Sequence, residues 1–169
     1  ATGRDVKPRL IKSVDTVEQE IAEAASLGIN ENHLRLVRHG MYQVSNSQRG
    51  TAYSNRIEPK EFRMAGKTGT SQVRNITAAE RARGVFRNDQ LPWERRDHAL
   101  FVDFAPYDNP RIAVSIVVEH GSGGSTAAAP IARDITLQAL YGDDPPLDAY
   151  PRKDHGRIQT QQEKLRQMR

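Results

Sequence analysis

The sequence predicts an α/β protein in the broad sense, and more strictly an α+β protein, in which an antiparallel sheet is flanked by helices. Two apolar, β-branched runs surround a Pro/Asp/Asn turn within residues 98–119, a pattern typical of a β-hairpin. A third run, residues 61–73, contains Thr and Val residues that favour a strand over a helix. Apolar residues at three- and four-residue steps elsewhere in the chain indicate the helices.

Two helices are expected before the sheet. The first is predicted over residues 17–27, with Val17 and Ile21 on one face, and Gly28 offers the left-handed conformation that ends many helices. The second is expected to begin after Asn30, a favourable N-cap residue. Its apolar stripe is expected to lie in the core and consists of Leu34, Val37, Met41 and Val44.

A last helix is expected after the hairpin. Ser125 or Thr126 caps its start, Pro130 falls in its first turn, where no helical hydrogen bond is lost, and Gly142 ends it. Its buried stripe is predicted to consist of Ile131, Ile135, Ala139 and Leu140. The two hairpin strands carry apolar residues at both parities, so helices are expected to cover both faces of this sheet.

The chain divides into one predicted domain, residues 1–142, and a polar tail, residues 143–169. The tail is rich in Pro and charge, and we expect it to be mostly disordered, with one helical stretch near residues 159–168. Residues 74–97 are charged and aperiodic, and we expect a long loop that is mobile when no substrate is bound. Trp93 is the large apolar residue near its end, and we expect it to anchor the loop locally.

Composition narrows the function classes. The net charge is +4, from 25 Lys and Arg against 21 Asp and Glu, but basic and acidic residues are interleaved rather than gathered in a stripe. This argues against a nucleic-acid partner, which needs a one-sided basic surface. No apolar run is long enough to cross a bilayer. The absence of Cys excludes disulfides and thiolate metal sites, and the five His residues lack metal-ligand spacing, so no metal or cofactor is expected.

The most informative residues are Lys67, Thr68, Gly69 and Thr70, in the middle of the third strand-like run. They combine a positive charge, two hydroxyl donors and a glycine, and such a set suits an anionic ligand. Because Gly69 has no Cβ, a ligand backbone could lie close to the strand. Lys-Thr-Gly is also a known motif of serine β-lactamases and penicillin-binding proteins. Judged on residue content alone, however, an exposed strand end is the commoner explanation of these four residues.

Three segments together give a family resemblance. Arg49-Gly50-Thr51-Ala52, then Lys67-Thr68-Gly69-Thr70-Ser71-Gln72-Val73, then Phe104-Ala105-Pro106-Tyr107-Asp108-Asn109-Pro110 occur in one order. This order resembles the C-terminal half of the transpeptidase domain of class B penicillin-binding proteins, above all the elongation-specific group of rod-shaped Gram-negative bacteria. The resemblance covers about residues 1–142. It implies part of the penicillin-binding transpeptidase fold, which is also that of serine β-lactamases.

The resemblance also implies an activity, D,D-transpeptidation in peptidoglycan cross-linking during cell elongation. Lys67 and Thr70 would be catalytic, and Thr68, Gly69 and Thr70 would bind the substrate. The expected ligands are the D-Ala-D-Ala end of a peptidoglycan stem peptide and β-lactam antibiotics. The expected partners are membrane proteins of the elongation complex, and the expected location is the periplasmic face of the bacterial inner membrane.

The nucleophile of this family lies in a Ser-x-x-Lys motif, and no Ser here is followed three positions later by Lys. Ser13-Val14-Asp15 and Tyr53-Ser54-Asn55 mimic the family's Ser-x-Asn motif, but we interpret both as coincidences of position. The nucleophile is therefore expected on an N-terminal portion of the same enzyme. Two alternatives stay open, a non-catalytic binding or scaffold fragment and, with less support, a serine β-lactamase fragment. Labelling by a fluorescent penicillin would separate an acylated enzyme from a scaffold.

Overall fold

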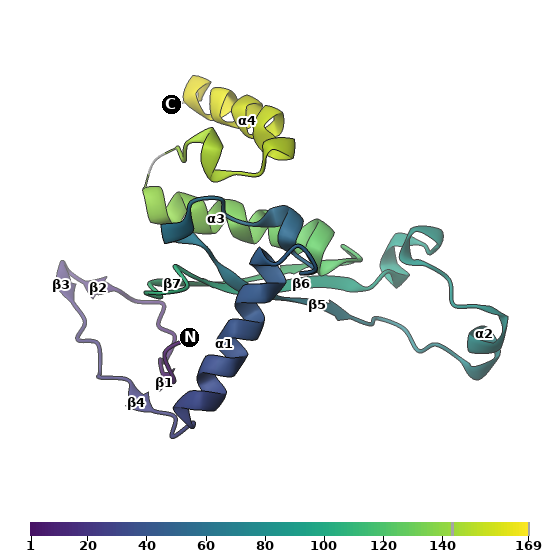
Figure 1. Ribbon diagram of the computed structural model, residues 1–169, viewed down its shortest axis with the longest axis horizontal. Coiled ribbons are helices and arrows are strands. Elements are labelled where there is room, and N and C mark those ends of the chain that lie inside the picture. Colours follow the sequence, from purple (N-terminus) through teal and green to yellow (C-terminus); the bar gives the residue numbers. More distant parts are fainter. Residues whose placement is uncertain (143, 169) are drawn as a thin grey trace. The chain divides into compact units, whose positions relative to one another are not determined.

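The computed structural model describes residues 1–142 and 144–168, which fall into two compact units, Ala1–Arg38 and His39–Arg169 (Figure 1). Asp143 and Arg169, the two ends of the predicted tail, lie outside the described residues. The second unit contains the three-stranded sheet and the hydrophobic core cluster. Each unit is described by itself below.

The first unit consists of short strands and the beginning of a helix. Strand β1 (Arg4–Asp5) pairs with β4 (Ala25–Ser26), and β2 (Ser13–Val14) pairs with β3 (Val17–Glu18). The helix predicted over residues 17–27 is therefore wrong. The side chains intended for its apolar face are 65% (Val17) and 73% (Ile21) exposed, so an amphipathic helix would have no surface to bury there.

Helix α1 (Glu31–Asn46) confirms the second predicted helix and begins in the first unit and ends in the second. The Asn30 side chain accepts a hydrogen bond from the backbone N–H of Asn32 at 2.9 Å, as expected of an N-cap residue. The predicted stripe is only partly correct. Val44 packs against the core, whereas Val37 is 61% exposed.

The sheet of the second unit has three antiparallel strands in the order β5-β6-β7. Strand β5 (Ala65–Ser71) confirms the third strand-like run, and β6 (His98–Ala105) and β7 (Ile112–Val118) form the predicted hairpin. In the register, Gly69 lies opposite Leu100 and Asp103 lies opposite Val114. Together with the helices, this sheet confirms the α+β fold class.

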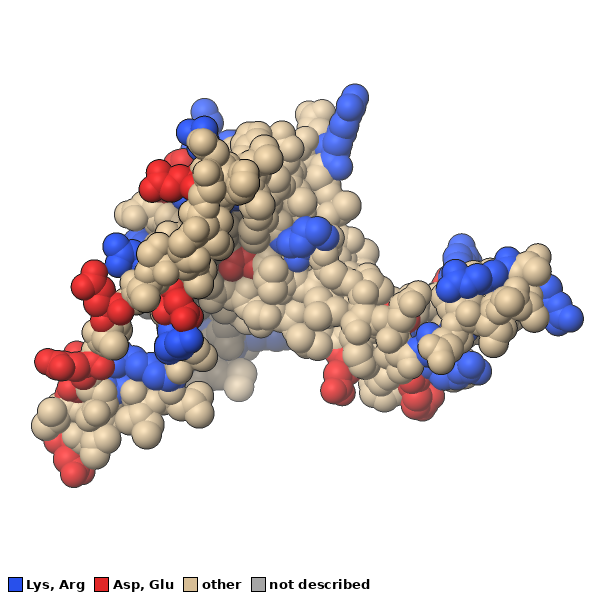
Figure 2. Space-filling model, turned by 90° about the horizontal axis from the view of Figure 1, so that it is seen from below, with Lys and Arg blue, Asp and Glu red and all other residues tan. Residues whose placement is uncertain are grey.

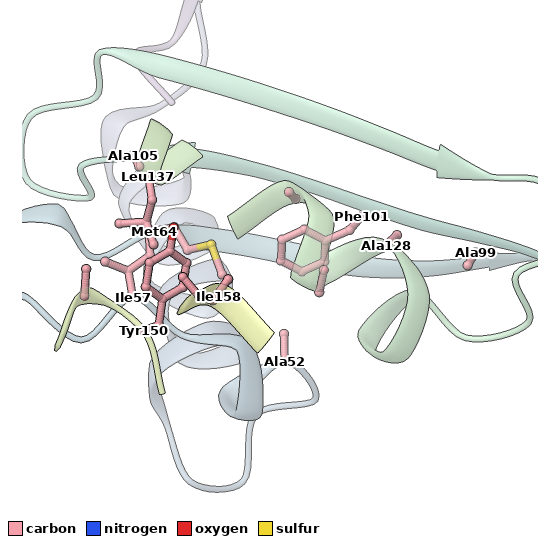
Figure 3. Packing of buried hydrophobic residues seen from close by; sticks show 13 residues of the cluster. Ala52, Ile57, Met64, Ala99, Phe101, Ala105, Ala128, Leu137, Tyr150 and Ile158 are labelled. Atoms are coloured by element: carbon pink, nitrogen blue, oxygen red, sulfur yellow. The ribbon is translucent and has the colours of Figure 1, made fainter. Parts of the chain in front are cut away.

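One face of the sheet is covered by a π-helical turn (Gly124–Ala128) and by helix α3 (Ala129–Tyr141), which lies along the strands in Figure 1. Here Phe101 packs in the core with small residues of the turn and the helix (Figure 3). The predicted stripe of this helix is mostly wrong, since Ile131 is 43% and Ile135 46% exposed, and of its four residues only Leu140 packs against the core. The helix residues that are buried instead are Ala129, Ala132, Arg133, Thr136 and Leu137.

The prediction that helices cover both faces of the sheet is wrong for the face opposite α3. Along β7 exposed and half-buried residues alternate, and Val117 is 58% exposed. On β6, Val102 is 42% exposed. Within the part of the chain that the structure describes, α3 and the π-helical turn cover one face only. The two-sided apolar pattern of the hairpin therefore leaves an apolar surface in contact with solvent.

The segment predicted as a disordered tail has defined structure in residues 144–168. It forms two 3-10 turns (Leu147–Ala149 and Arg152–Asp154) and helix α4 (His155–Gln167), which Figure 1 shows beyond α3 on the side away from the sheet. Tyr150 is 4% and Ile158 3% exposed, and both join the core near Ile57 and Met64 (Figure 3). Burial raises the pKa of Tyr150 to about 12. The polar composition of this segment predicts disorder, but a few apolar residues are enough to pack it against the core.

Arg133 of α3 holds the C-terminal segment by ion pairs. Its guanidinium is fully buried and donates to Asp154 at 2.6 Å and to Asp134 at 2.7 Å. The same guanidinium lies 5.2 Å from the ring centroid of Tyr150. A buried guanidinium needs such partners, because an unpaired buried charge is strongly unfavourable. This network explains how a charged residue can occupy the core face of α3.

The predicted loop, residues 74–97, contains helix α2 (Ala78–Arg83) and two 3-10 turns (Asn88–Gln90 and Trp93–Arg95), and it extends away from the sheet in Figure 1. The Arg74 guanidinium donates to the Glu80 carboxylate at 2.6 Å. Figure 2 shows basic side chains gathered on this extension and mixed with acidic ones elsewhere on the face in view. Among the described residues, no helix is both long and apolar enough to span a membrane.

Candidate active site

The four predicted site residues lie together on β5, at one edge of the sheet. Strand β5 pairs with β6 on one side, and in the described residues no other strand pairs with its outer side. Lys67 and Thr70 are exposed, and Thr68 and Gly69 are half-buried. An edge strand of this kind offers free backbone donors and acceptors to an extended peptide.

The register places the charge and the hydroxyls on opposite faces of β5. Thr68 lies opposite Phe101, which is fully buried on the face that packs against α3. Lys67 lies opposite Val102, on the uncovered face. Directly opposed residues of antiparallel strands project to the same side, and successive residues alternate. A single ligand can therefore contact the Lys67 ammonium group and the two threonine hydroxyls only if it lies along the outer edge of the strand, from which both faces can be reached.

Lys67 itself folds back along its own strand. Its Nζ donates a hydrogen bond to the backbone carbonyl oxygen of Thr68 at 2.6 Å. This contact holds the ammonium group beside the Thr68 segment, on the exposed side of the strand. A carboxylate that approaches this edge would meet both the ammonium charge and the neighbouring hydroxyls.

Gly69 lies under the π-helical turn that opens α3. A Cβ on Gly124 would lie 2.7 Å from the carbonyl oxygen of Gly69 and 2.3 Å from that of Leu100. Only glycine fits this contact, so the backbone of the turn lies directly on the motif strand. The side-chain amide of Asn55, which is 3% exposed, donates to the backbone carbonyl of Ser125 at 2.7 Å and fixes the same turn from another direction.

Several groups around the motif were not assigned a role by sequence reasoning. The Thr51 hydroxyl lies 3.2 Å from the Thr68 hydroxyl. In the sequence, Thr51 is marked only by the Gly-Thr-Ala step that contributes to the family resemblance. Of the two sequences that mimic the Ser-x-Asn motif, one holds the buried Asn55, and the other lies in the β2–β3 hairpin of the first unit.

A cluster of rings borders the far end of the motif strand. His98 lies opposite Ser71, and its Nδ1 accepts a hydrogen bond from the backbone N–H of His120 at 2.9 Å. The ring of Trp93 lies 4.3 Å from that of His120, while Trp93 remains 55% exposed. The end of the long loop is thus attached beside β5. Among the described residues, no group of three or more His, Asp or Glu side chains could hold a metal ion.

Comparison with known proteins agrees with this geometry. The sequence model of the penicillin binding protein transpeptidase domain matches residues 1–137. The chain belongs to the penicillin-binding protein transpeptidase family. This match confirms the family resemblance given by the sequence motifs.

Within the penicillin-binding transpeptidase family, the similar curated proteins include peptidoglycan D,D-transpeptidases named MrdA. The Haemophilus influenzae protein is 32% identical in an alignment of 153 residues that covers 88% of this chain and 23% of that protein. The Escherichia coli K12 protein is 33% identical over 116 residues, or 69% of this chain and 17% of that protein. The chain therefore spans less than a quarter of the length of these relatives.

Solved structures of penicillin-binding transpeptidases match as well. Pseudomonas aeruginosa PBP2 in complex with WCK 5153 gives a TM-score of 0.60 at 30% identity. The match covers 90% of this chain and 28% of the PBP2 chain. Helicobacter pylori PBP2 in complex with MreC gives a TM-score of 0.54 at 29% identity. That match covers 76% of this chain and 20% of the solved chain. Both matches support the α+β transpeptidase fold and the resemblance to penicillin-binding protein 2.

Proposed function

We propose that this chain forms the substrate-binding side of a peptidoglycan D,D-transpeptidase that cross-links the cell wall during elongation. The observation that carries the proposal is the Lys67–Thr70 motif on the open outer edge of β5, with its hydroxyls and its charge both accessible. Relatives named peptidoglycan D,D-transpeptidase support the reaction type.

In the proposed reaction, a serine oxygen attacks the carbonyl carbon of the penultimate D-Ala of a stem peptide. The tetrahedral intermediate collapses with release of the terminal D-Ala, and the acyl group then passes from the serine to an amine of a neighbouring strand. This chain contains no Ser-x-x-Lys, so the nucleophile comes from another portion of the enzyme. The stem peptide would lie along the outer edge of β5 as an added strand.

Three residues of the motif have defined tasks in this reaction. Lys67 supplies positive charge that attracts the anionic substrate and favours deprotonated forms of nearby groups. Thr68 and Thr70 donate hydroxyl hydrogen bonds to the terminal carboxylate of the stem peptide, or to the matching carboxylate of a β-lactam. The backbone N–H of Thr70 provides one donor of the oxyanion hole, and the loss of one such donor typically costs about 2.7–4 kcal/mol.

The location and partners follow from the same relationship. We place the assembled enzyme at the periplasmic face of the inner membrane, where peptidoglycan is cross-linked and cell shape is maintained. Helicobacter pylori PBP2 has been solved in complex with MreC. By analogy, we propose that the enzyme containing this chain assembles with membrane proteins of the elongation complex.

The Thr70→Val variant tests the proposal in the domain assembled with its nucleophile-bearing portion. Val keeps the β-branched shape and the backbone N–H, so only the hydroxyl and its bond to a charged carboxylate are lost. Such bonds contribute about 1.5–3 kcal/mol, so we expect the second-order acylation rate constant for a β-lactam to fall about 10- to 150-fold with little change in the thermal melt.

The matched control is Ser115→Val, which removes an exposed hydroxyl from β7, two strands away from the outer edge of β5. This variant should acylate at the unaltered rate. If Thr70→Val lowered the melting temperature and left the acylation rate of the folded fraction unchanged, Thr70 would be a structural residue. The substrate-binding role of the whole motif would then lose its support.

A further inference from the structure

The Thr51 hydroxyl contacts the motif although Thr51 is not part of the strand. Its Oγ1 lies 3.2 Å from the Oγ1 of Thr68, a hydrogen-bond distance between residues 17 positions apart. Thr51 lies between the end of α1 and the 3-10 turn Tyr53–Asn55. The contact thus links a separate segment of the chain to the hydroxyl that we assign to carboxylate binding.

The segment that carries Thr51 is held rigidly against the end of α1. A Cβ on Gly50 would lie 2.3 Å from the carbonyl oxygens of both Gln43 and Val44, so only glycine allows this approach. The backbone N–H of Ala52 donates to the Val44 carbonyl at 3.0 Å, and Ala52 is fully buried. Thr51 is therefore fixed on both sides by its neighbours in the chain.

The same segment is tied to the turn that lies on the motif strand. The buried Asn55 donates from its side-chain amide to the Ser125 carbonyl at 2.7 Å, and Gly124 packs directly on Gly69. Thr51 and Thr68 are thus held by one connected framework. This framework fixes the two backbone positions, from which the hydroxyl of the exposed Thr51 reaches that of the half-buried Thr68.

Hydrogen-bond chemistry then assigns a direction to the contact. A hydroxyl has one hydrogen to donate, and its oxygen can also accept. If Thr68 is to donate to a carboxylate, its oxygen has to accept from Thr51. A chain of two such bonds polarises the second donor and strengthens it.

We propose that Thr51 is a positioning residue, which donates to the Thr68 oxygen and thereby directs the Thr68 hydrogen to the carboxylate of the substrate. This inference rests on the proposed function, because it needs Thr68 to bind a carboxylate. Thr51 acts through Thr68 and does not itself contact the reacting atoms.

The test compares Thr51→Val with Thr51→Ser in the domain assembled with its nucleophile-bearing portion. We expect Val to lower the second-order acylation rate constant about 2- to 12-fold, the effect of one hydrogen bond between uncharged groups, and Ser to restore the rate. With the methyl ester of the same β-lactam, which lacks the carboxylate charge, Val should have little effect. Ser54→Ala, an exposed change in the same segment, should leave both rates unaltered.

A double variant separates this role from a general structural one. In a Thr68→Val background, Thr51→Val should have no further effect on acylation. An equal loss in both backgrounds, an equal loss with the ester, or no loss at all would overturn the inference. If Thr68→Val and Thr70→Val were also without effect, the proposed function itself would fail, whereas an effect of Thr68→Val without one of Thr51→Val would refute the inference alone.

The hydrogen bond can also be tested in the 169-residue chain by itself. Thr51→Val should move the methyl NMR resonance of Thr68, and Thr51→Ser should move it less. A Thr68 resonance unmoved by Thr51→Val would contradict the contact, and with it the positioning role.

Discussion

Replacing Asp103 by Asn should flatten the pH dependence of the stability of this protein. Asp103 is 4% exposed in the middle of β6, where one carboxylate oxygen accepts a hydrogen bond from the Thr136 hydroxyl of α3 at 3.1 Å. The other oxygen, Oδ2, is buried and accepts no hydrogen bond from the described residues. Burial raises the pKa of Asp103 to about 7, and the bond from Thr136 opposes part of this rise.

The sign of the effect follows from the protons bound in each state. In the unfolded chain an Asp has a pKa of about 3.9, so above that pH the unfolded state releases a proton that the folded state keeps. The contribution of Asp103 to stability is therefore fully present below about pH 4 and is lost as the pH rises toward the folded pKa of about 7. Between about pH 5 and pH 8 the loss covers about two pKa units, or about 3 kcal/mol.

Urea unfolding of the full chain across this pH range measures the effect. Asn keeps an oxygen for the Thr136 bond, and any cost of its buried amide is the same at every pH. The difference between the wild type and Asp103→Asn should therefore change by about 3 kcal/mol in favour of the variant as the pH rises from about 5 to about 8.

Two further variants sharpen this experiment. Asp108→Asn, an exposed change in the hairpin turn, should leave the wild-type pH profile unaltered. Thr136→Val removes the bond that lowers the pKa of Asp103, so the loss of stability should continue to higher pH. Parallel profiles for the wild type and Asp103→Asn would refute the assignment of a proton to this buried carboxyl.

Two other predictions concern the C-terminal segment and the isolated chain. Arg133→Ala leaves Asp154 and Asp134 without their buried partner, so the free energy of unfolding measured in urea should fall by about 3–5 kcal/mol. The control is Arg157→Ala. Because the Arg157 side chain is 48% exposed, its loss should lower the free energy of unfolding by less than about 1 kcal/mol. Similar losses for both variants would argue against the buried network. The 169-residue chain alone should take no covalent label from a fluorescent penicillin, and a penicilloyl adduct mapped to any of its serines would refute the assigned roles.

The strands could be predicted from the sequence because their signals are local. The hairpin is marked by two β-branched runs around a Pro/Asp/Asn turn, and β5 by its Thr and Val residues. The cap of α1 at Asn30 is local as well. The helix predicted over residues 17–27 was wrong because its apolar spacing says nothing about whether a surface exists to bury it.

The phase of α3 could not be predicted because it depends on distant partners. Arg133 is buried through Asp154, 21 residues away, and Thr136 through Asp103, 33 residues away. The pattern of apolar residues predicts that the side chains of Arg133 and Thr136 face solvent. The tail was misjudged for the same reason, since Ile158 finds its core partners only after the chain has folded.

The sequence predicts the motif of the candidate site but not the surroundings of that motif. Lys67, Thr68, Gly69 and Thr70 were identified from residue types and order alone. Their division between the two faces of the strand follows from strand alternation, but the open edge on which they lie is a property of the sheet. The contact between Thr51 and Thr68 requires two packed segments and leaves no periodic trace in the sequence.

The ion pair of Arg133 also bears on where a cooperative folding unit ends. The stretch matched by the transpeptidase sequence model stops at residue 137, whereas Asp154, to which Arg133 is paired, lies 17 positions farther along. The end of this sequence model therefore does not coincide with the end of the cooperative folding unit. A polypeptide that ended at residue 137 would keep the motif strand and yet leave Arg133 without its partner Asp154. Proteolytic removal of the segment after residue 142 would then destabilise α3 and the sheet that it covers, without altering any residue of the candidate site.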